Sequence, residues 1–381
     1  MDFRTRVAKN IFEYLNNKGI KYIVLRNAEQ ITSKLGHDID LCVDNSEMRL
    51  FIEALSEYCR SNQLRVFRTQ KMAYFNVFVI YSEIHLFFIR IDVFNAIDYR
   101  GFPYIFFDEL YRSSLFSEGV RRCSPEYQYA ILILKILLNN TSTEHINQTQ
   151  IRLRILEKEI EENQLKKLLI TLTGREKEEF TEKFTRLNRE GKNITLRRIR
   201  KSTLSRIFSR SPVKCILGRL AWSLSHVLRL LIPLGVKILI ESRNKENFEK
   251  ISEILRTNLE FQLFNLAIIE RYDDKECDLD ENRWNLMARL KYGIRTIIDK
   301  SRTRLIIVKI SARSKNEETK IFKRTRLFSD IHLVLNDENS FYNGNTKHCI
   351  SITVPKEELL DVPSIMKPII GIMLTRFDEV I

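Results

Sequence analysis

Apolar and polar residues alternate in the segment 36–43, which reads Gly-His-Asp-Ile-Asp-Leu-Cys-Val. Because alternate side chains of a β-strand share one face, Ile39 and its apolar neighbours would point into a core. Asp38 and Asp40 would then lie side by side on the other face. Two carboxylates this close repel each other unless a cation lies between them, and oxygen ligands of this kind suit Mg²⁺. The segment therefore predicts a metal site on a strand.

The surrounding pattern predicts an α/β arrangement. The predicted helices are 2–18 and 49–59, and the predicted strands are 21–25, 64–68, 74–81 and 84–94. This order favours a sheet with mixed pairing over a parallel doubly wound sheet. The last strand carries Asp92, which would complete a cluster of three carboxylates if this strand lies beside the Asp38 strand. Such a cluster can hold two Mg²⁺ ions that clamp nucleotide phosphates and activate an attacking hydroxyl.

An Asp-x-Asp strand followed by a later strand with Ile-Asp resembles the nucleotidyltransferase superfamily of the polymerase-beta type. The resemblance covers roughly residues 1–140. It implies a nucleotidyltransferase fold in which Asp38, Asp40 and Asp92 are the catalytic residues and the metal ligands. It also implies two Mg²⁺ ions as cofactors and an NTP as a substrate.

The turn that would bind phosphate departs from the pattern of that superfamily. A Gly-Ser or Gly-Gly pair usually ends the preceding strand, whereas this chain reads Leu25-Arg26-Asn27 there. Arg26 can contact phosphate by its charge, and we assign Arg26 and Asn27 to nucleotide binding. Gly36 lets a phosphate approach the backbone closely, and His37 adjoins the acid pair, where it can contact phosphate or substrate, so we assign both to nucleotide binding as well. A hydrogen-bond partner of an acid is the alternative role for His37.

A closer resemblance is to uncharacterised bacterial nucleotidyltransferase-like proteins, often encoded among polysaccharide-biosynthesis genes. Their order of Leu-Arg-x, Asp-Ile-Asp-Leu, Ile-Asp and Arg-Gly recurs here, with Arg100-Gly101 as the last pair. It implies nucleotidyl transfer from an NTP to a hydroxyl or phosphate acceptor such as a sugar or glycan precursor. One alternative is a catalytically inactive binding or regulatory module on a polyanion or membrane surface. Another is nucleotidyl modification of a protein or tRNA.

The middle of the chain is helical by its pattern. A helix is predicted over 125–138, and its second half is apolar apart from Lys135. A buried helix is the favoured interpretation, and a wall of the nucleotide site is the alternative. Residues 149–190 predict two further helices, separated at Gly174.

Residues 186–229 contain twelve Lys and Arg residues and one acid, Glu190. Such a run is typical of a solvated face or a linker. Its second half fits an amphipathic helix, with Ile216, Leu217, Leu220, Ala221, Leu224, Val227, Leu228 and Leu231 on one side. Packing of this side on an adjoining domain is favoured, and attachment to an anionic membrane surface is the alternative. Nucleic acid is a less favoured partner because few aromatic residues interleave with the cations.

Beyond residue 233 the chain alternates strands and helices. The predicted strands are 236–240, 304–310, 331–335 and 349–353, and the predicted helices are 251–259 and 363–378. The order resembles a thymidylate-kinase-type P-loop domain with a parallel sheet. A P-loop needs two glycines, a Lys and a Ser or Thr. Ser242, Asn247, Phe248 and Glu249 occupy those places. We therefore expect a degenerate kinase-like domain without nucleotide binding.

Length, charge and composition limit the number of domains, the partners and the cellular compartment that we expect. The 381 residues allow several domains. The expected domains are a nucleotidyltransferase-like domain (1–122), a helical region (123–195), a basic amphipathic connector (196–232) and the kinase-like α/β domain (233–381). The net charge of +14 predicts attraction to polyanions. Six scattered cysteines, no apolar signal core and no long apolar run predict a cytoplasmic protein, peripheral to the membrane if the connector binds lipid.

Overall fold

The computed structural model divides the chain into two compact units. The first contains Met1–Ser61, Gln70–Phe78 and Ile91–Ser225, and the second contains Asn62–Thr69, Val79–Arg90 and His226–Ile381. The structure describes residues 2–32, 35–36, 38–138, 143–175, 177, 180, 194–231, 236–241, 245–259, 266–272, 304–310, 331–336, 349–353, 366–367, 369–371, 374 and 378–379. The domain boundaries expected from the sequence stay a prediction.

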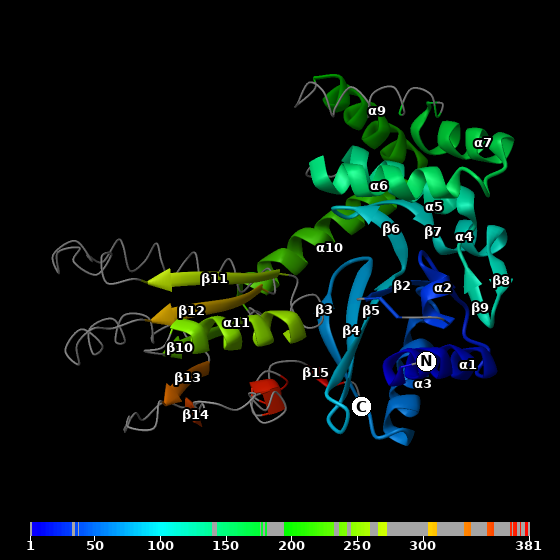
Figure 1. Ribbon diagram of the computed structural model, residues 1–381. Helices are drawn as coiled ribbons and strands as arrows, with labels where there is room; N and C mark the ends of the chain where they lie inside the picture. The colour runs from blue at the N-terminus through cyan, green and yellow to red at the C-terminus, as the bar shows by residue number, and fades with distance from the viewer. Residues whose placement is uncertain are drawn as a thin grey trace. The chain divides into compact units, whose positions relative to one another are not determined.

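A mixed sheet holds the N-terminal part of the chain together, with the strand order β3-β4-β5-β2-β1-β9-β8 (Figure 1). Its strands are β1 (Tyr22–Val24), β2 (Asp38–Val43), β3 (Arg65–Lys71), β4 (Phe75–Ser82), β5 (Phe87–Phe94), β8 (Leu115–Ser117) and β9 (Val120–Arg122). Strand β1 pairs antiparallel with β2 and parallel with β9. This pairing confirms the predicted mixed α/β class. At the β3 edge, β15 (Asp378–Glu379) adds a short antiparallel pairing.

Strand β5 begins later than the sequence predicts. Residues 83–86 form a turn, and Leu86 has a φ of +48°. A left-handed φ interrupts the extended backbone, so the regular strand starts only at Phe87. The shift leaves Asp92 within the strand, where the sequence predicts it.

Helices α1 (Phe3–Asn17) and α3 (Met48–Ser61) pack on this sheet, and the short α2 (Ala28–Thr32) follows β1. The rings of Phe12 on α1 and Tyr22 on β1 lie 5.2 Å apart between centroids. Phe51 on α3 and Phe78 on β4 meet at 6.2 Å. Aromatic pairs of this kind bury much apolar area and fix the helices on the strands.

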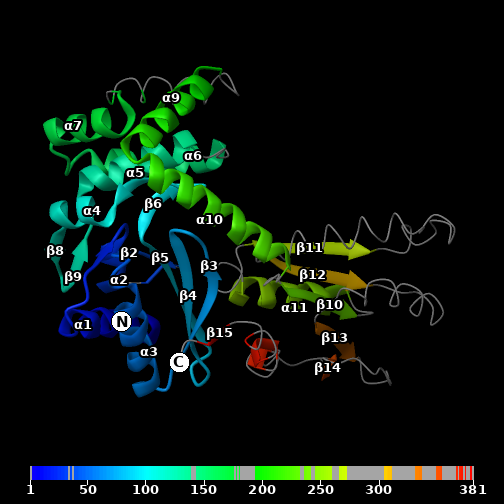
Figure 2. The same ribbon diagram turned by 180° about the vertical axis from the view of Figure 1, so that it is seen from behind.

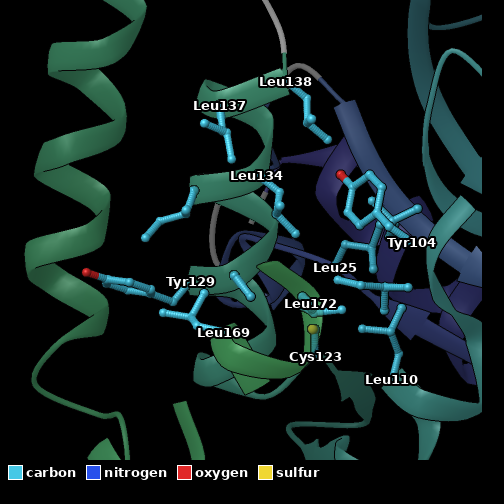
Figure 3. Packing of buried hydrophobic residues seen from close by; sticks show 14 of the residues in the cluster. Leu25, Tyr104, Leu110, Cys123, Tyr129, Leu134, Leu137, Leu138, Leu169 and Leu172 are labelled. Atoms are coloured by element: carbon cyan, nitrogen blue, oxygen red, sulfur yellow. The ribbon is translucent and has the colours of Figure 1, made fainter. Parts of the chain in front are cut away.

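A second apolar core surrounds α5 (Pro125–Leu138), whose bounds match the prediction. The other elements nearby are the hairpin β6 (Ala96–Tyr99) and β7 (Phe102–Phe106), and the helices α4 (Phe107–Ser113), α6 (Thr143–Leu156), α7 (Glu162–Thr173) and α9 (Ile194–Arg210). Figure 3 shows Leu134 and Leu138 of α5 beside Tyr104 and Leu25. Most of α5 is therefore core, as the favoured interpretation holds. Gly174 ends α7 with a φ of +77°, as predicted, but the stretch before it is two helices, α6 and α7, separated at residues 157–161 rather than one.

The basic run is helical rather than a linker. Its first half is α9, where Thr203 and Ile207 are buried. The guanidinium groups of Arg200, Arg206 and Arg210 donate hydrogen bonds to the backbone carbonyls of Leu137, Thr171 and Tyr104. Arginine reaches these carbonyls because its long apolar stem lies along the core while its head stays polar. Of the two alternatives for this run, α9 fits a solvated face rather than a linker, because most of its described side chains are exposed while Thr203 and Ile207 are buried.

Helix α10 (Pro212–Leu231) begins with a proline at the first helical position, where its missing N–H costs nothing. The backbones of Gly218 and Gly101 approach closely. A Cβ on Gly101 would lie 2.8 Å from the nitrogen of Arg219 and closer still to Gly218. Gly101 also has a φ of +89°. The glycine of the Arg100-Gly101 pair is therefore needed to seat α10.

A five-stranded parallel sheet forms part of the second unit, with the order β11-β12-β10-β13-β14. The elements are β10 (Val236–Glu241), α11 (Lys245–Leu259), β11 (Leu266–Tyr272), β12 (Arg304–Ile310), β13 (Ile331–Asn336) and β14 (Cys349–Thr353). The parallel pairing agrees with the sequence prediction. The predicted helix 363–378 lies largely outside the described residues. None of the described helices is both long and apolar enough to cross a membrane.

Candidate functional site

Three carboxylates from two strands converge in the first unit. Asp38 and Asp40 come from β2, and Asp92 comes from β5, the next strand of the sheet. One oxygen of each lies within 4.8 Å of the others. We refer to these three residues as the acidic cluster. The structure therefore brings together the trio that the sequence predicts.

The strands explain why the cluster holds its position. Ile39 and Leu41, the apolar partners in the alternation, are buried. Asp40 and Asp92 are each only 7% exposed, whereas Asp38 is half-buried. A cation can therefore reach the cluster past Asp38, while the sheet fixes the other two carboxylates from behind.

Arg26 contacts the acidic cluster directly. Its Nε donates to Asp40 Oδ2, and its Nη2 lies 3.4 Å from Asp38 Oδ2. The backbone brings it there, because the Leu25 N–H donates to the Asp40 carbonyl at 2.9 Å. The sequence assigns Arg26 to phosphate, whereas here its guanidinium neutralises part of the acidic cluster.

The pKa values reflect this crowding. Burial raises the pKa of Asp40, Arg26 lowers it, and the charge of Asp38 raises it again, with a net rise above the ordinary value. Burial lowers the pKa of Arg26, but the carboxylates of the acidic cluster outweigh that effect and raise it. Three carboxylates against one guanidinium leave an excess of negative charge.

The donor set of the acidic cluster fits a divalent cation. All three groups offer hard oxygen ligands, the kind that Mg²⁺, Ca²⁺ and Mn²⁺ prefer. Because a single guanidinium compensates one charge, a divalent ion could balance the remaining two. The cluster can therefore hold a metal ion.

Asn27 supplies the turn conformation that a glycine usually gives. Its φ is +54°, in the left-handed region. Asparagine enters this region more readily than other residues with a side chain. A residue with a side chain thus adopts the left-handed turn here, and Asn27 lines the cavity beside the cluster.

A cavity of about 610 Å³ adjoins Asp40 and Arg26. This volume lies within the usual range for small-molecule sites. Its lining includes Leu25, Asn27, Glu29, Phe94, Ile97, Asp98, Tyr104, Arg122, Gln128, Ile131, Leu132, Lys135, Arg152, Ile155, Leu156 and Glu159. One face of α5 thus forms a wall of the cavity while the rest of the helix is core. The buried-helix interpretation is therefore confirmed for most of α5, and its role as a wall of a nucleotide site stays a prediction.

The cavity is lined by three cationic side chains that are far from the acidic cluster in the sequence. Arg122 lies on β9, Lys135 on α5 and Arg152 on α6. Within the described residues, the buried Nε of Arg122 has no hydrogen-bond partner. Burial and the nearby Arg26 lower the pKa of Lys135, while Asp40 raises it. These cations favour an anionic ligand. Only Lys135 has a sequence signal, as the lone charge in an apolar run.

Asp98 lines the same cavity and is a half-buried acid. Its carboxylate accepts a hydrogen bond from the Gly101 N–H at 2.7 Å, which holds the Arg100-Gly101 turn. Burial raises the pKa of Asp98 to about 6, although that hydrogen bond lowers it. The folded protein therefore binds this proton more tightly than the unfolded chain does.

We expect Asp98→Asn to stabilise the protein above pH 6. Between the ordinary carboxyl pKa of 3.8 and about 6, wild type loses stability as pH rises, because folding then buries a charge. Asparagine keeps the acceptor without the charge, so the gain is about 1–3 kcal/mol at pH 8 and vanishes near pH 4. Urea unfolding across this pH range measures it. Asp98→Ala, which loses the acceptor, should be less stable than Asp98→Asn, and equal gains at all pH values would contradict the prediction.

The remaining predicted site residues differ in their placement. Gly36 is half-buried ahead of β2 and is not part of the described cavity lining. His37 lies outside the described residues. Comparisons of the chain with models of protein families, with curated proteins and with solved structures find no match. Function is therefore inferred from the acidic cluster and the cavity.

Proposed function

We propose that the protein transfers a nucleotidyl group from an NTP to a hydroxyl or phosphate acceptor, in a Mg²⁺-dependent reaction of the polymerase-beta type. The observation that carries the proposal is the convergence of three carboxylates beside a cavity lined by cations. The resemblance to nucleotidyltransferase-like proteins of polysaccharide clusters points to a sugar or glycan precursor as acceptor. Protein or tRNA hydroxyls would satisfy the same chemistry.

The residues divide into two groups by role. Asp38, Asp40 and Asp92 would hold two Mg²⁺ ions, which supply charge neutralisation at the phosphates. Lys135 and Arg122 would bind the negative phosphate tail from the cavity side. The apolar wall formed by α5 would bind the base and exclude water.

The reaction would be an in-line displacement at phosphorus in which no group is oxidised or reduced. The acceptor oxygen forms a bond to the α-phosphorus, and the bond from that phosphorus to pyrophosphate breaks. An Asp92 carboxylate oxygen would take the proton that the acceptor hydroxyl loses. Arg26 would move from the carboxylates toward the phosphates once the ions replace its charge, so its two roles are compatible.

We propose a nucleotidyltransferase fold for the N-terminal sheet and a degenerate P-loop-kinase-like fold for the C-terminal one. The central position of β10 supports the kinase-like fold. The chain continues from β10 to β11 and β12 on one side of it and then crosses to β13 and β14 on the other, as at a switch point where ligands bind. Only residues 242–244 separate β10 from α11. The first turns of α11 carry Asn247, Phe248 and Glu249 where a P-loop has a glycine, a Lys and a Ser or Thr, which supports lost nucleotide binding there.

Binding of NTP to the purified chain tests the function without knowledge of the acceptor. We expect calorimetry with non-hydrolysable analogues of the four NTPs to give Mg²⁺-dependent binding of at least one of them. Lys135→Gln removes a charge-assisted contact and should weaken that binding about 10–100-fold. Lys167→Gln, an exposed change on α7, is the matched control and should bind as wild type does. The proposal fails if wild type neither binds an NTP with Mg²⁺ nor releases pyrophosphate.

The position of Arg26 favours one competing function. Its guanidinium already lies on two carboxylates of the acidic cluster, in the place of a cation. A non-catalytic binding or regulatory module would keep this arrangement permanently and would need no metal. The response of the acidic cluster to divalent ions separates the two functions, because only a transferase needs the cluster to bind a metal ion.

A further inference from the structure

Helix α10 presents an exposed apolar stripe. The exposed side chains are Val213 (66%), Ile216 (52%), Leu217 (60%), Leu220 (63%), Leu224 (59%), Val227 (53%) and Leu228 (49%). Their spacing of three and four residues places them on one face of the helix. We call these seven residues the α10 stripe. Figure 2 shows α10 as one unbroken helix, so the stripe is continuous.

The opposite face of α10 attaches the helix to the rest of the first unit. Cys215 is buried there, and Gly218 meets Gly101 backbone to backbone. The hydroxyl of Tyr74 also donates to the Lys214 carbonyl at 3.2 Å. The side of the helix that faces the rest of this unit therefore carries the small residues Cys215 and Gly218 and, one turn further on, the half-buried Trp222. The large aliphatic residues face away from it, the reverse of an ordinary surface helix.

The sequence around the stripe is positively charged. Residues 194–231 contain nine Lys and Arg residues and no Asp or Glu. On the helix, Lys214 and Arg219 lie at the two borders of the stripe. Lys214 contacts the Phe106 ring, and Arg219 lies over the Trp222 ring and donates to the Arg100 carbonyl. These contacts hold both cations beside the stripe.

We propose that α10 binds the surface of an anionic membrane, with the stripe inserted among the acyl chains and the flanking cations at the lipid phosphates. An exposed apolar face bordered by Lys and Arg is the form of helices that lie in the plane of a bilayer. Each cation near an anionic surface adds further attraction. The polar and charged residues on the rest of α10 keep the helix in the interface.

A second copy of the chain is a poorer occupant of the stripe. Two stripes packed together would bring two sets of cations close with no acid from 194–231 between them, and like charges repel. Anionic lipid removes that repulsion. The proposal does not rest on catalysis, so loss of nucleotidyl transfer would leave it standing.

Flotation of the full chain with vesicles tests the proposal. Vesicles of phosphatidylcholine with about 30 mol% phosphatidylserine should carry wild type upward, and pure phosphatidylcholine should bind it at least about tenfold less, because the cationic attraction is lost. The double change Leu220→Glu with Leu224→Glu puts two acids in the stripe and should weaken binding at least about tenfold. Both residues are exposed, so the fold should tolerate the change, which circular dichroism checks.

The control is Leu50→Glu with Ile84→Glu, two equally apolar residues outside α10 that are 53% and 66% exposed. This variant has the same net charge and should float within about twofold of wild type, because the stripe is intact. The proposal is overturned if wild type stays unbound, if both variants float or fail alike, or if neutral vesicles bind as well as anionic ones. A dimer detected by light scattering that Leu220→Glu with Leu224→Glu abolishes, without flotation of wild type, would assign the stripe to a second copy instead.

Discussion

Asp92→Asn should lower the rate of the proposed nucleotidyl transfer about a thousandfold, equivalent to about 4 kcal/mol of transition-state stabilisation. The change removes one of three negative ligands from a cluster whose oxygens lie within 4.8 Å, and an amide can neither bind a hard cation as strongly nor accept the acceptor's proton. The side chain keeps its shape, so β5 should stay in the sheet. Pyrophosphate release with the NTP that wild type binds best, reported as kcat/KM, measures the effect.

Asp44→Asn is the matched control for this change. Asp44 follows β2 directly, is half-buried and undergoes the same chemical substitution, but it lies outside the acidic cluster. Its activity should stay within about twofold of wild type, since no catalytic interaction is lost. Asp40→Asn should lose activity as Asp92→Asn does. Activity above one tenth of wild type in Asp92→Asn would remove that residue from the catalytic cluster.

Local pattern was sufficient to predict the acidic cluster. The alternation around Ile39 fixes which face of β2 carries the acids, and a single carboxylate in the Asp92 strand leaves one candidate for the third ligand. Helix α5 could be predicted equally well, because Pro125 marks its start and an apolar run continues to Leu138. Such features depend on neighbours in sequence, which a single chain displays.

The cations of the site depend instead on contacts that sequence spacing does not encode. Arg26 follows β1 and reaches Asp40 across the antiparallel pair, so its role depends on strand register. Arg122 and Arg152 come from elements that are adjacent only after folding. The sequence also does not show that the α10 stripe is exposed, since a helical wheel shows which residues share a face but not which face meets the protein.

Arg26→Gln should make the stability of the protein depend on divalent cations. Without Arg26, the buried Asp40 carboxylate lies beside two other acids and loses its hydrogen-bonded cation, although the charge of Lys135 still acts on it. Removal of one partner from a buried ion pair costs 3–5 kcal/mol, and because Arg26 is 31% exposed we expect a loss of about 2–4 kcal/mol in chelator. Mg²⁺ or Mn²⁺ at millimolar concentration should restore most of that loss, since a bound ion replaces the guanidinium. Urea unfolding with and without the ion measures both effects.

Two further variants serve as controls for the Arg26→Gln change. Arg49→Gln removes an exposed pair with Glu53 and should cost less than about 1 kcal/mol, with no response to metal. Asp40→Asn added to Arg26→Gln removes the unpaired buried charge, so the double variant should regain stability in chelator and lose its response to Mg²⁺. A bare Arg26→Gln protein that stays unstable in Mg²⁺ and Mn²⁺ would mean that the acidic cluster accepts a guanidinium but no metal ion. In that case the acidic cluster serves to form the ion pair with Arg26, and the non-catalytic binding or regulatory module becomes the favoured function.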